Sequence, residues 1–134
     1  MAKQTGLGWT TLSVDDAGGT PRDIRNDITN MDFSTPYNQQ EATGIDKSAL
    51  ERLQLLADLS GTLNSVFNAT ATTSIHAVMS GDLRVVRTIT FVIAAKTLAG
   101  EVLFSDYALT RAAGGEFTAQ HPFSLADGTV PVWA

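Results

Sequence analysis

The chain has 134 residues, of which 43% are apolar and 17% are charged, and it contains no cysteine. This length suits one domain and is too short for two, while the apolar content excludes a disordered tail. The lack of cysteine excludes disulfides, thiolate zinc sites and a thiol nucleophile. No apolar run reaches the ~18 residues of a membrane span, and no secretory leader is visible. We therefore expect a soluble single domain, residues 1–134, without an export signal or a membrane partner.

The net charge of the chain also limits the classes of function that the sequence supports. Fourteen acidic residues against nine basic ones give a net charge of −5, and Arg84 with Arg87 is the closest approach to a basic cluster. Binding to a nucleic-acid backbone needs several lysines or arginines on one face. The composition therefore argues against specific DNA binding.

The first third of the chain predicts strands followed by a long loop. Residues 9–14 alternate between apolar and polar and end in a turn over 15–21 that contains two glycines. Residues 24–33 predict a weaker strand with one polar face, at a sheet edge or lining a surface. Residues 34–47 have no periodicity, so we expect an extended loop. A loop this long in a small domain usually has a function.

The strongest pattern in the sequence covers Leu53 to Asn68. Six of the eight odd positions from 53 to 67 are apolar, against two of the eight even positions from 54 to 68, which predicts a long strand. A helix over 47–56 remains an alternative, because Ser48 and Glu51 match a capping box.

The second half of the chain predicts one short helix and three further strands. Ser74 is a candidate N-cap for a helix over 75–79, which Ser80 and Gly81 would end. The remaining segments are strands over 83–95, 101–111 and 116–125, turns over 96–100 and 112–115, and an extended C-terminal arm over 126–134. Six or seven strands without a βαβ rhythm predict a mainly β fold, an antiparallel β-sandwich or barrel with one short α-helix.

No pattern in the sequence indicates catalysis. His76 and His121 are the only imidazoles and have no metal-ligand spacing. The serines lack a nucleophile-elbow context. We therefore predict no catalytic residue, no metal and no cofactor. Two alternatives stay open: a small β-sandwich carbohydrate-binding module with Trp9 or Tyr37 as an aromatic platform, and an enzyme built on the two histidines.

Four segments carry a resemblance to a known family. They are EATGIDKSALERL at 41–53, DLSGTLNSVFN at 58–68, TRAAGGEF at 110–117 and LADGTVPVW at 125–133. Together they resemble the major tail tube proteins of long-tailed, siphovirus-type bacteriophages. The resemblance covers most of the chain, and its motifs are structural and not catalytic. The chain has no added immunoglobulin-like domain of the kind that some relatives carry.

The resemblance implies a structural role in a virion tail. It implies a non-enzymatic β-sandwich subunit that assembles in the host cytoplasm into hexameric rings, which stack into a hollow tube for DNA ejection. Its partners would be copies of itself, a tape-measure protein, and tail-tip and terminator proteins, while DNA passes without specific binding. A ring of six copies carries 6 × −5 = −30, which suits a conduit for a polyanion.

Two groups of residues are candidates for this role. The polar face of the predicted long strand is a candidate lining of the lumen, with an ordinary solvated face as the alternative: Gln54, Asp58, Ser60, Thr62 and Asn64. The loop over 35–47 and the arm over 126–134 are candidates for contact between rings, unless they fold back on their own subunit. The residues there that would gain from being covered are Tyr37, Ile45, Val130, Val132 and Trp133.

Overall fold

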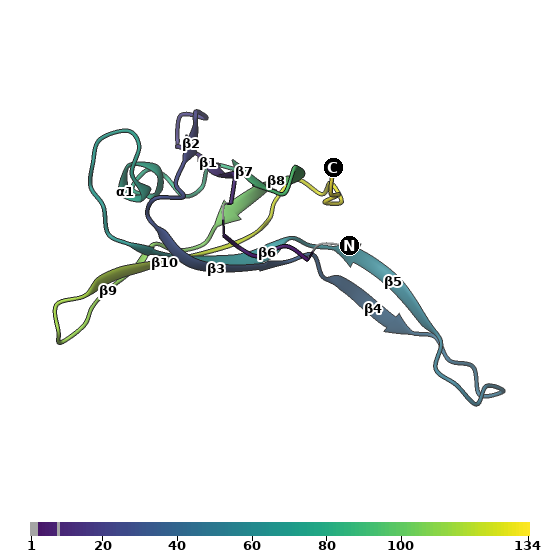
Figure 1. The fold of residues 1–134 in the computed structure, drawn as a ribbon. Helices are drawn as coiled ribbons and strands as arrows, with labels where there is room; N and C mark the ends of the chain where they lie inside the picture. The colour runs from purple at the N-terminus through teal and green to yellow at the C-terminus, as the bar shows by residue number, and fades with distance from the viewer. Residues whose placement is uncertain (1–2, 8) are drawn as a thin grey trace.

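Ten β-strands and one short helix make up the part of the chain that the computed structural model describes, residues 3–7 and 9–134 (Figure 1). Their bounds are β1 Thr11–Asp15, β2 Pro21–Asp23, β3 Ile28–Ser34, β4 Tyr37–Glu41, β5 Arg52–Ala57, β6 Ser60–Val66, α1 Ile75–Met79, β7 Arg87–Ile93, β8 Lys96–Phe104, β9 Ala108–Arg111 and β10 Phe117–Leu125.

The strands form one large antiparallel sheet and one separate hairpin. The large sheet has the order β2-β1-β7-β8-β10-β6-β3, and β9 also pairs with β10. Strands β8 and β9 pair with opposite ends of β10, over 123–125 and 117–120 respectively. Strands β4 and β5 pair only with each other among the described strands.

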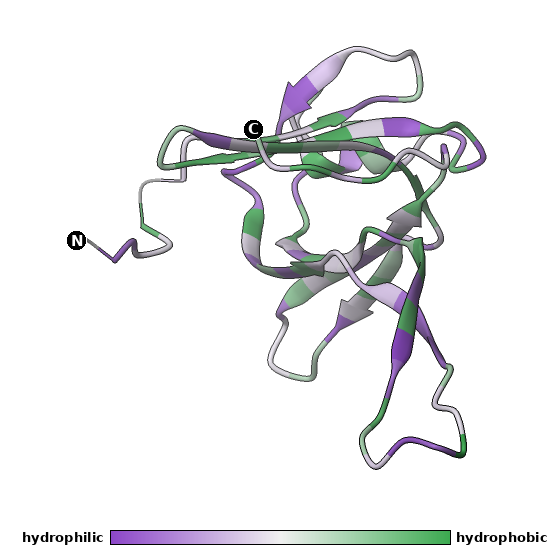
Figure 2. Ribbon diagram, turned by 90° about the vertical axis from the view of Figure 1, so that its right-hand side faces the viewer, coloured by the Kyte–Doolittle hydropathy of each residue, from purple (hydrophilic) through white to green (hydrophobic). Residues whose placement is uncertain are grey.

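The large sheet folds over so that its two ends face each other across one core. Phe33 on β3 stacks on Phe91 of β7 with ring centroids 4.3 Å apart, although these strands are far apart in the sheet order. Trp9 packs edge-on against both rings. Hydrophilic and hydrophobic residues alternate along the strands, so each layer turns its apolar side inward (Figure 2). The predicted mainly β, antiparallel class is confirmed.

The short helix begins and ends where its capping residues predict. The Ser74 hydroxyl accepts a hydrogen bond from the Ala77 amide at 3.1 Å, and the Ser80 amide donates to the His76 carbonyl at 2.9 Å. Helix residues Ile75, Val78 and Met79 are buried in the core. No helix in the described ranges is long and apolar enough to cross a membrane.

Two buried charged residues hold the helix in place. Asp27 accepts a hydrogen bond from the Ile75 amide and another from the Asn68 side chain, both at 2.8 Å. Arg87 is fully buried and donates to the carbonyls of Val78 and Asp82. Burial lowers the pKa of Arg87, and the nearby carboxylates oppose this effect. The two side chains therefore fix both ends of α1 to the sheet.

The predicted strands between 83 and 111 have the wrong boundaries. Residues 83–86 form a turn, because Arg87 binds the carbonyls before it and β7 begins only there. The turn predicted over 96–100 is wrong: the chain turns at Ala94 and Ala95, whose φ values are 51° and 62°. Two-residue hairpin turns at positive φ favour asparagine and glycine, so two alanines give no signal. The strand predicted over 101–111 is divided between β8 and β9.

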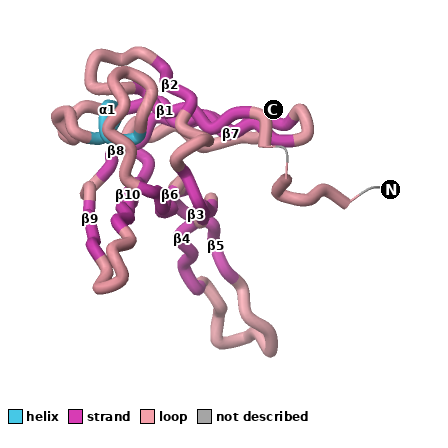
Figure 3. The backbone as a smooth tube through the Cα atoms, turned by 60° about the vertical axis from the view of Figure 1, so that its left-hand side comes forward, coloured by secondary structure: helices cyan, strands magenta, loops and turns pink. Residues whose placement is uncertain are grey.

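The segment from 34 to 66 differs most from expectation. The helix alternative over 47–56 is wrong, and the long strand over 53–68 is interrupted between Ala57 and Ser60. The expected loop over 34–47 contains β4, whose residues are all exposed and show no alternation. Strand β4 forms because it pairs with β5. We call residues 37–57 the arm, which projects away from the body of the protein (Figures 1 and 3).

Candidate functional site

Three neighbouring strands present a continuous polar surface on the side of the sheet that faces away from the core. The register places side chains in three rows across β3, β6 and β10. Thr118 on β10 lies next to the row that contains Gln120. We call this surface the polar face: the rows are Asn30, Asn64 and Gln120; Asp32, Thr62 and Pro122; and Ser34, Ser60 and Ser124. The residues between them, such as Leu63, His121 and Phe123, are buried.

Hydroxyl and amide groups dominate the chemistry of the polar face. It contains no lysine, arginine or histidine, and Asp32 is its one charged residue. The Asn64 amide donates to the Asn30 side-chain oxygen at 2.6 Å, which links β6 to β3. Such a surface offers no cation to a phosphate group.

The five residues predicted to line a lumen do not stay together. Ser60, Thr62 and Asn64 lie side by side on the polar face. Gln54 lies on the arm, where it accepts a hydrogen bond from Gln39. Asp58 lies at the break between β5 and β6, where Oδ1 accepts from the amides of Leu59 and Leu125 at 2.8 and 3.2 Å.

The sequence predicted one polar face for the strand over 24–33, but it did not align this strand or β10 with the polar residues of β6. The signal of these two strands was the alternation of polar side chains with Met31 and Phe33 on β3, and with His121 and Phe123 on β10. The missing information was the register that aligns these strands with β6.

Open strand edges lie on both sides of the polar face, at β3 and at β9, and β2 forms a further open edge at the far end of the same sheet. Strand β3 pairs with β6 and strand β9 with β10, and no other described strand pairs with either of them. Residues 24–33 were predicted to form a strand at a sheet edge or lining a surface; β3 covers Ile28–Ser34 and lies at the edge. An open strand edge exposes unpaired amides and carbonyls, which can pair with another chain.

The arm has one apolar side that its own chain leaves uncovered. Leu53 and Leu55 lie on this side and are 50% and 47% exposed, whereas Tyr37, which is 43% exposed, lies on the same side of β4 as Gln39. The opposite side carries the Gln39 to Gln54 hydrogen bond of 2.8 Å. Ile45, in the connection between β4 and β5, is fully exposed. Apolar side chains in this number on a projecting hairpin indicate an interaction surface.

The C-terminal arm over 126–134 returns to its own subunit. The Ala126 amide donates to the Glu101 carbonyl at 2.9 Å, and Ala134 exchanges two hydrogen bonds with Thr97. The segment between these points keeps its apolar side chains at least 47% exposed: Val130, Val132 and Trp133. Contact between rings through these residues, or through Tyr37 and Ile45, stays a prediction.

A groove of about 320 Å³ lies between two segments. One is the root of the arm, where residues 55–58 join the body of the protein, and the other is the C-terminal arm. We call this groove the root groove; its lining is Leu55, Leu56, Ala57, Asp58, Leu125, Ala126, Gly128, Thr129 and Val130. Asp58 is the one charged residue among these nine. The C-terminal arm therefore lies beside the end of β5, the strand that pairs with β4 in the predicted contact loop.

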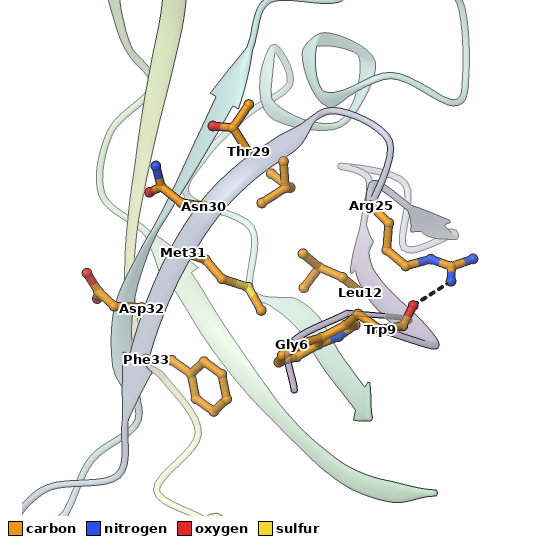
Figure 4. Close-up of a pocket in the computed structure, with 10 residues that line it drawn as sticks. Gly6, Trp9, Leu12, Arg25, Thr29, Asn30, Met31, Asp32 and Phe33 are labelled. Carbon is orange, nitrogen blue, oxygen red and sulfur yellow. Dashed lines mark hydrogen bonds between the residues drawn. The ribbon is translucent and has the colours of Figure 1, made fainter. Parts of the chain in front are cut away.

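A larger groove of about 540 Å³ opens where the two ends of the folded sheet meet (Figure 4). Trp9, Leu12, Met31 and Phe33 point toward one another across it. The Trp9 indole N–H donates to the Thr11 carbonyl at 2.7 Å, and its ring packs edge-on against two phenylalanines. Trp9 is therefore part of the packing and not a free platform for a sugar ring.

The two histidines belong to one cluster, in which His121 is buried and His76 is half-buried. His121 Nε2 and the Ser65 hydroxyl are 2.8 Å apart, and His121 Nδ1 has no hydrogen-bond partner in the described chain. The Tyr107 ring lies 5.1 Å from the His121 ring, and its hydroxyl is 3.0 Å from His76 Nδ1. Burial raises the pKa of Tyr107. The serine and histidine pair lacks an orienting carboxylate and contact with solvent, so it packs the core.

Acid should destabilise the protein through His121. Burial lowers its pKa to about 4 in the folded state, against 6.5 for an ordinary histidine. Between these values the unfolded chain binds more protons, so stability is complete above about pH 6.5 and falls as the pH drops toward 4. We expect a loss of about 3 kcal/mol from this group, measured by urea unfolding across that range. His121→Gln should remove this part of the pH dependence, and an unchanged slope in the variant would contradict the assignment.

Comparisons with known proteins identify the fold. No protein-family model matches the chain, and no curated protein matches its sequence. A chain in the tail of an empty gene transfer agent particle, refined with C6 symmetry, superposes with a TM-score of 0.72 and 16% identity over 98% of both chains. A chain in the virion of a native gene transfer agent particle gives 0.70 and 14%, over 98% of this chain and 99% of that one.

A third match comes from a different kind of particle. A chain in the sixfold-symmetrised baseplate of the anti-feeding prophage superposes with a TM-score of 0.63 and 12% identity, over 100% of this chain and 97% of that one. The fold is thus found in a tail and in a baseplate. At the level of the fold, the resemblance of this chain to tail proteins is confirmed.

Proposed function

We propose that this chain is a structural subunit of a phage-like tail, which joins copies of itself into sixfold rings that stack into a tube. The single observation that carries this proposal is the polar face with an open strand edge on each side, at β3 and β9, in a fold shared with a C6-symmetric tail. The tube would serve as the conduit for DNA ejection.

The open edges indicate how a ring would close. Strands β9, β10, β6 and β3 lie side by side, so pairing β3 of one copy with β9 of the next gives 6 × 4 = 24 strands. With the usual strand spacing and tilt, such a barrel is about 45 to 50 Å across at the backbone, which leaves room for double-stranded DNA. Ring closure would also remove both open edges.

The polar face suits the bore of such a tube. It carries no cation to retain phosphate groups, and Asp32 adds one carboxylate per copy. DNA would therefore pass without specific binding. On this proposal the chain works in the virion tail, assembles in the host cytoplasm, and meets tape-measure, tail-tip and terminator proteins at the ends of the tube.

Electron microscopy of the concentrated, purified protein tests the proposal. We expect hollow rods or rings whose averaged end views show sixfold symmetry. Sedimentation as single subunits at every concentration reached would contradict the proposal, and measurable affinity for sugars in such a monomer would favour the carbohydrate-binding alternative.

A further inference from the structure

We propose that the root groove receives the β9–β10 hairpin of a second copy of this chain. This inference rests on the proposed self-assembly and names the two surfaces that would join successive rings. The hairpin comprises β9, β10 and the turn over 112–116 between them. Its apolar side carries Leu109 and Phe117, which are 44% and 38% exposed.

The two surfaces lie at opposite ends of one strand. Strand β6 begins at Ser60, directly after Asp58 and Leu59, and ends at Val66, which pairs with Thr118 of the hairpin. Seven strand residues separate the ends by about 20 Å, so one copy cannot place its own hairpin in its own groove. Figure 1 shows the hairpin and the arm projecting from the two ends of the sheet.

Both surfaces offer apolar side chains that gain by being covered. Leu55 and Leu56 at the groove are 47% and 79% exposed, and Val130 on the facing wall is 50% exposed. A volume of about 320 Å³ accommodates large side chains such as Leu109 and Phe117 of the hairpin. Burial of these groups supplies the attraction between copies.

The charges of the two surfaces are complementary. Asp58 is the one charged residue of the groove, and both of its hydrogen bonds in the described chain use Oδ1. Arg111 is the one cation between 108 and 125, and it lies opposite Phe117 on the apolar side of the hairpin. A guanidinium from the second copy would meet the remaining carboxylate oxygen, Asp58 Oδ2.

The geometry of this contact determines the kind of assembly. Each copy presents a groove at one end and a hairpin at the other, so the contact is head-to-tail and does not close on a dimer. It therefore continues from ring to ring and lengthens the tube.

Disulfide trapping tests this contact, because the chain contains no cysteine. The double variant Leu55→Cys with Leu109→Cys should give a ladder of dimers, trimers and higher covalent species when the assembled protein is oxidised. Each single variant should give no species beyond dimers. The matched pair Gln54→Cys with Leu109→Cys should not form the ladder, because Gln54 lies on the other side of the arm.

A charge variant gives a second, independent measurement. Arg111→Glu should raise the protein concentration needed for assembly at least tenfold, whereas Lys96→Glu, which changes an exposed cation at the start of β8, should leave it unchanged. Tubes that assemble without giving the Leu55 to Leu109 ladder would overturn this contact and leave the proposed function standing. A protein that never assembles, in any variant, would overturn both.

Discussion

Adding one methyl group at Gly61 is expected to displace strand β3 from the sheet. In Gly61→Ala, the new Cβ would lie 2.1 Å from the Asp32 carbonyl oxygen and 2.7 Å from Phe33 Cα. Both are backbone atoms of the neighbouring strand, so no side-chain rotation relieves the overlap. We expect the free energy of unfolding to fall by about 3 kcal/mol or more, measured by urea denaturation.

The effect should extend beyond the sheet itself. Displacing β3 separates Phe33 from Phe91 and opens an edge of the polar face, so Gly61→Ala should also prevent assembly. Gly18→Ala is the matched control, because its Cβ would make an ordinary contact of 3.4 Å with the Asp16 side chain. The control should change stability by less than about 0.5 kcal/mol. Equal unfolding midpoints for the two variants would show that β3 accommodates the methyl group.

The sequence predicted those elements whose signals are local. Ser74 and Ser80 bracket the helix, and the alternation in 117–125 defines β10, because capping and period-two patterns depend on neighbouring residues only. The turn at Ala94 and Ala95 was missed because alanine is not a residue that favours positive φ. Its conformation is imposed by the pairing of β7 with β8.

Elements that depend on distant partners were not predictable in the same way. Strand β4 has no apolar periodicity and exists only through its pairing with β5. The alternation of apolar and polar residues continues through residues 58 and 59, although the strand is interrupted there. The interruption arises because the Asp58 carboxylate binds the Leu59 and Leu125 amides. Arg87 occupies an inward-facing position of β7, where the alternation predicts an apolar residue. Its side chain can be buried there because α1 places the Val78 carbonyl within hydrogen-bonding distance.

The candidate site also combines residues with a local sequence signal and residues whose position depends on distant partners. Ser60, Thr62 and Asn64 lie together on the polar face because they share strand β6, and their polarity is visible in a single stretch of sequence. Their neighbours on β3 and β10 come from segments about 30 residues before and 60 residues after, aligned by a register that one sequence does not state. Gln54 does not lie with them, because β5 pairs with β4 in a separate hairpin.

The polar face should tolerate neutral side chains and fail with cationic ones. Thr62 lies in the middle row, between Asp32 and Pro122, and points away from the core. In the proposed tube, Thr62→Lys would add six ammonium groups to each ring of six copies, along the proposed path of the DNA. Because phosphate contacts accumulate along a polyanion, we expect assembled particles to retain DNA and to lose at least about tenfold in the rate of ejection. Raising the salt concentration should partly restore ejection.

Two matched variants separate this effect from damage to the fold. Thr62→Gln places a long neutral side chain at the same position and should leave ejection unchanged. Thr20→Lys places the same charge on an exposed turn before β2 and should also be neutral. Asp58 is unsuitable for this test, because its carboxylate holds two backbone amides. Ejection by Thr62→Lys particles at the rate of the Thr20→Lys control would show that the polar face does not line the path of the DNA, since a cation there would then meet no phosphate.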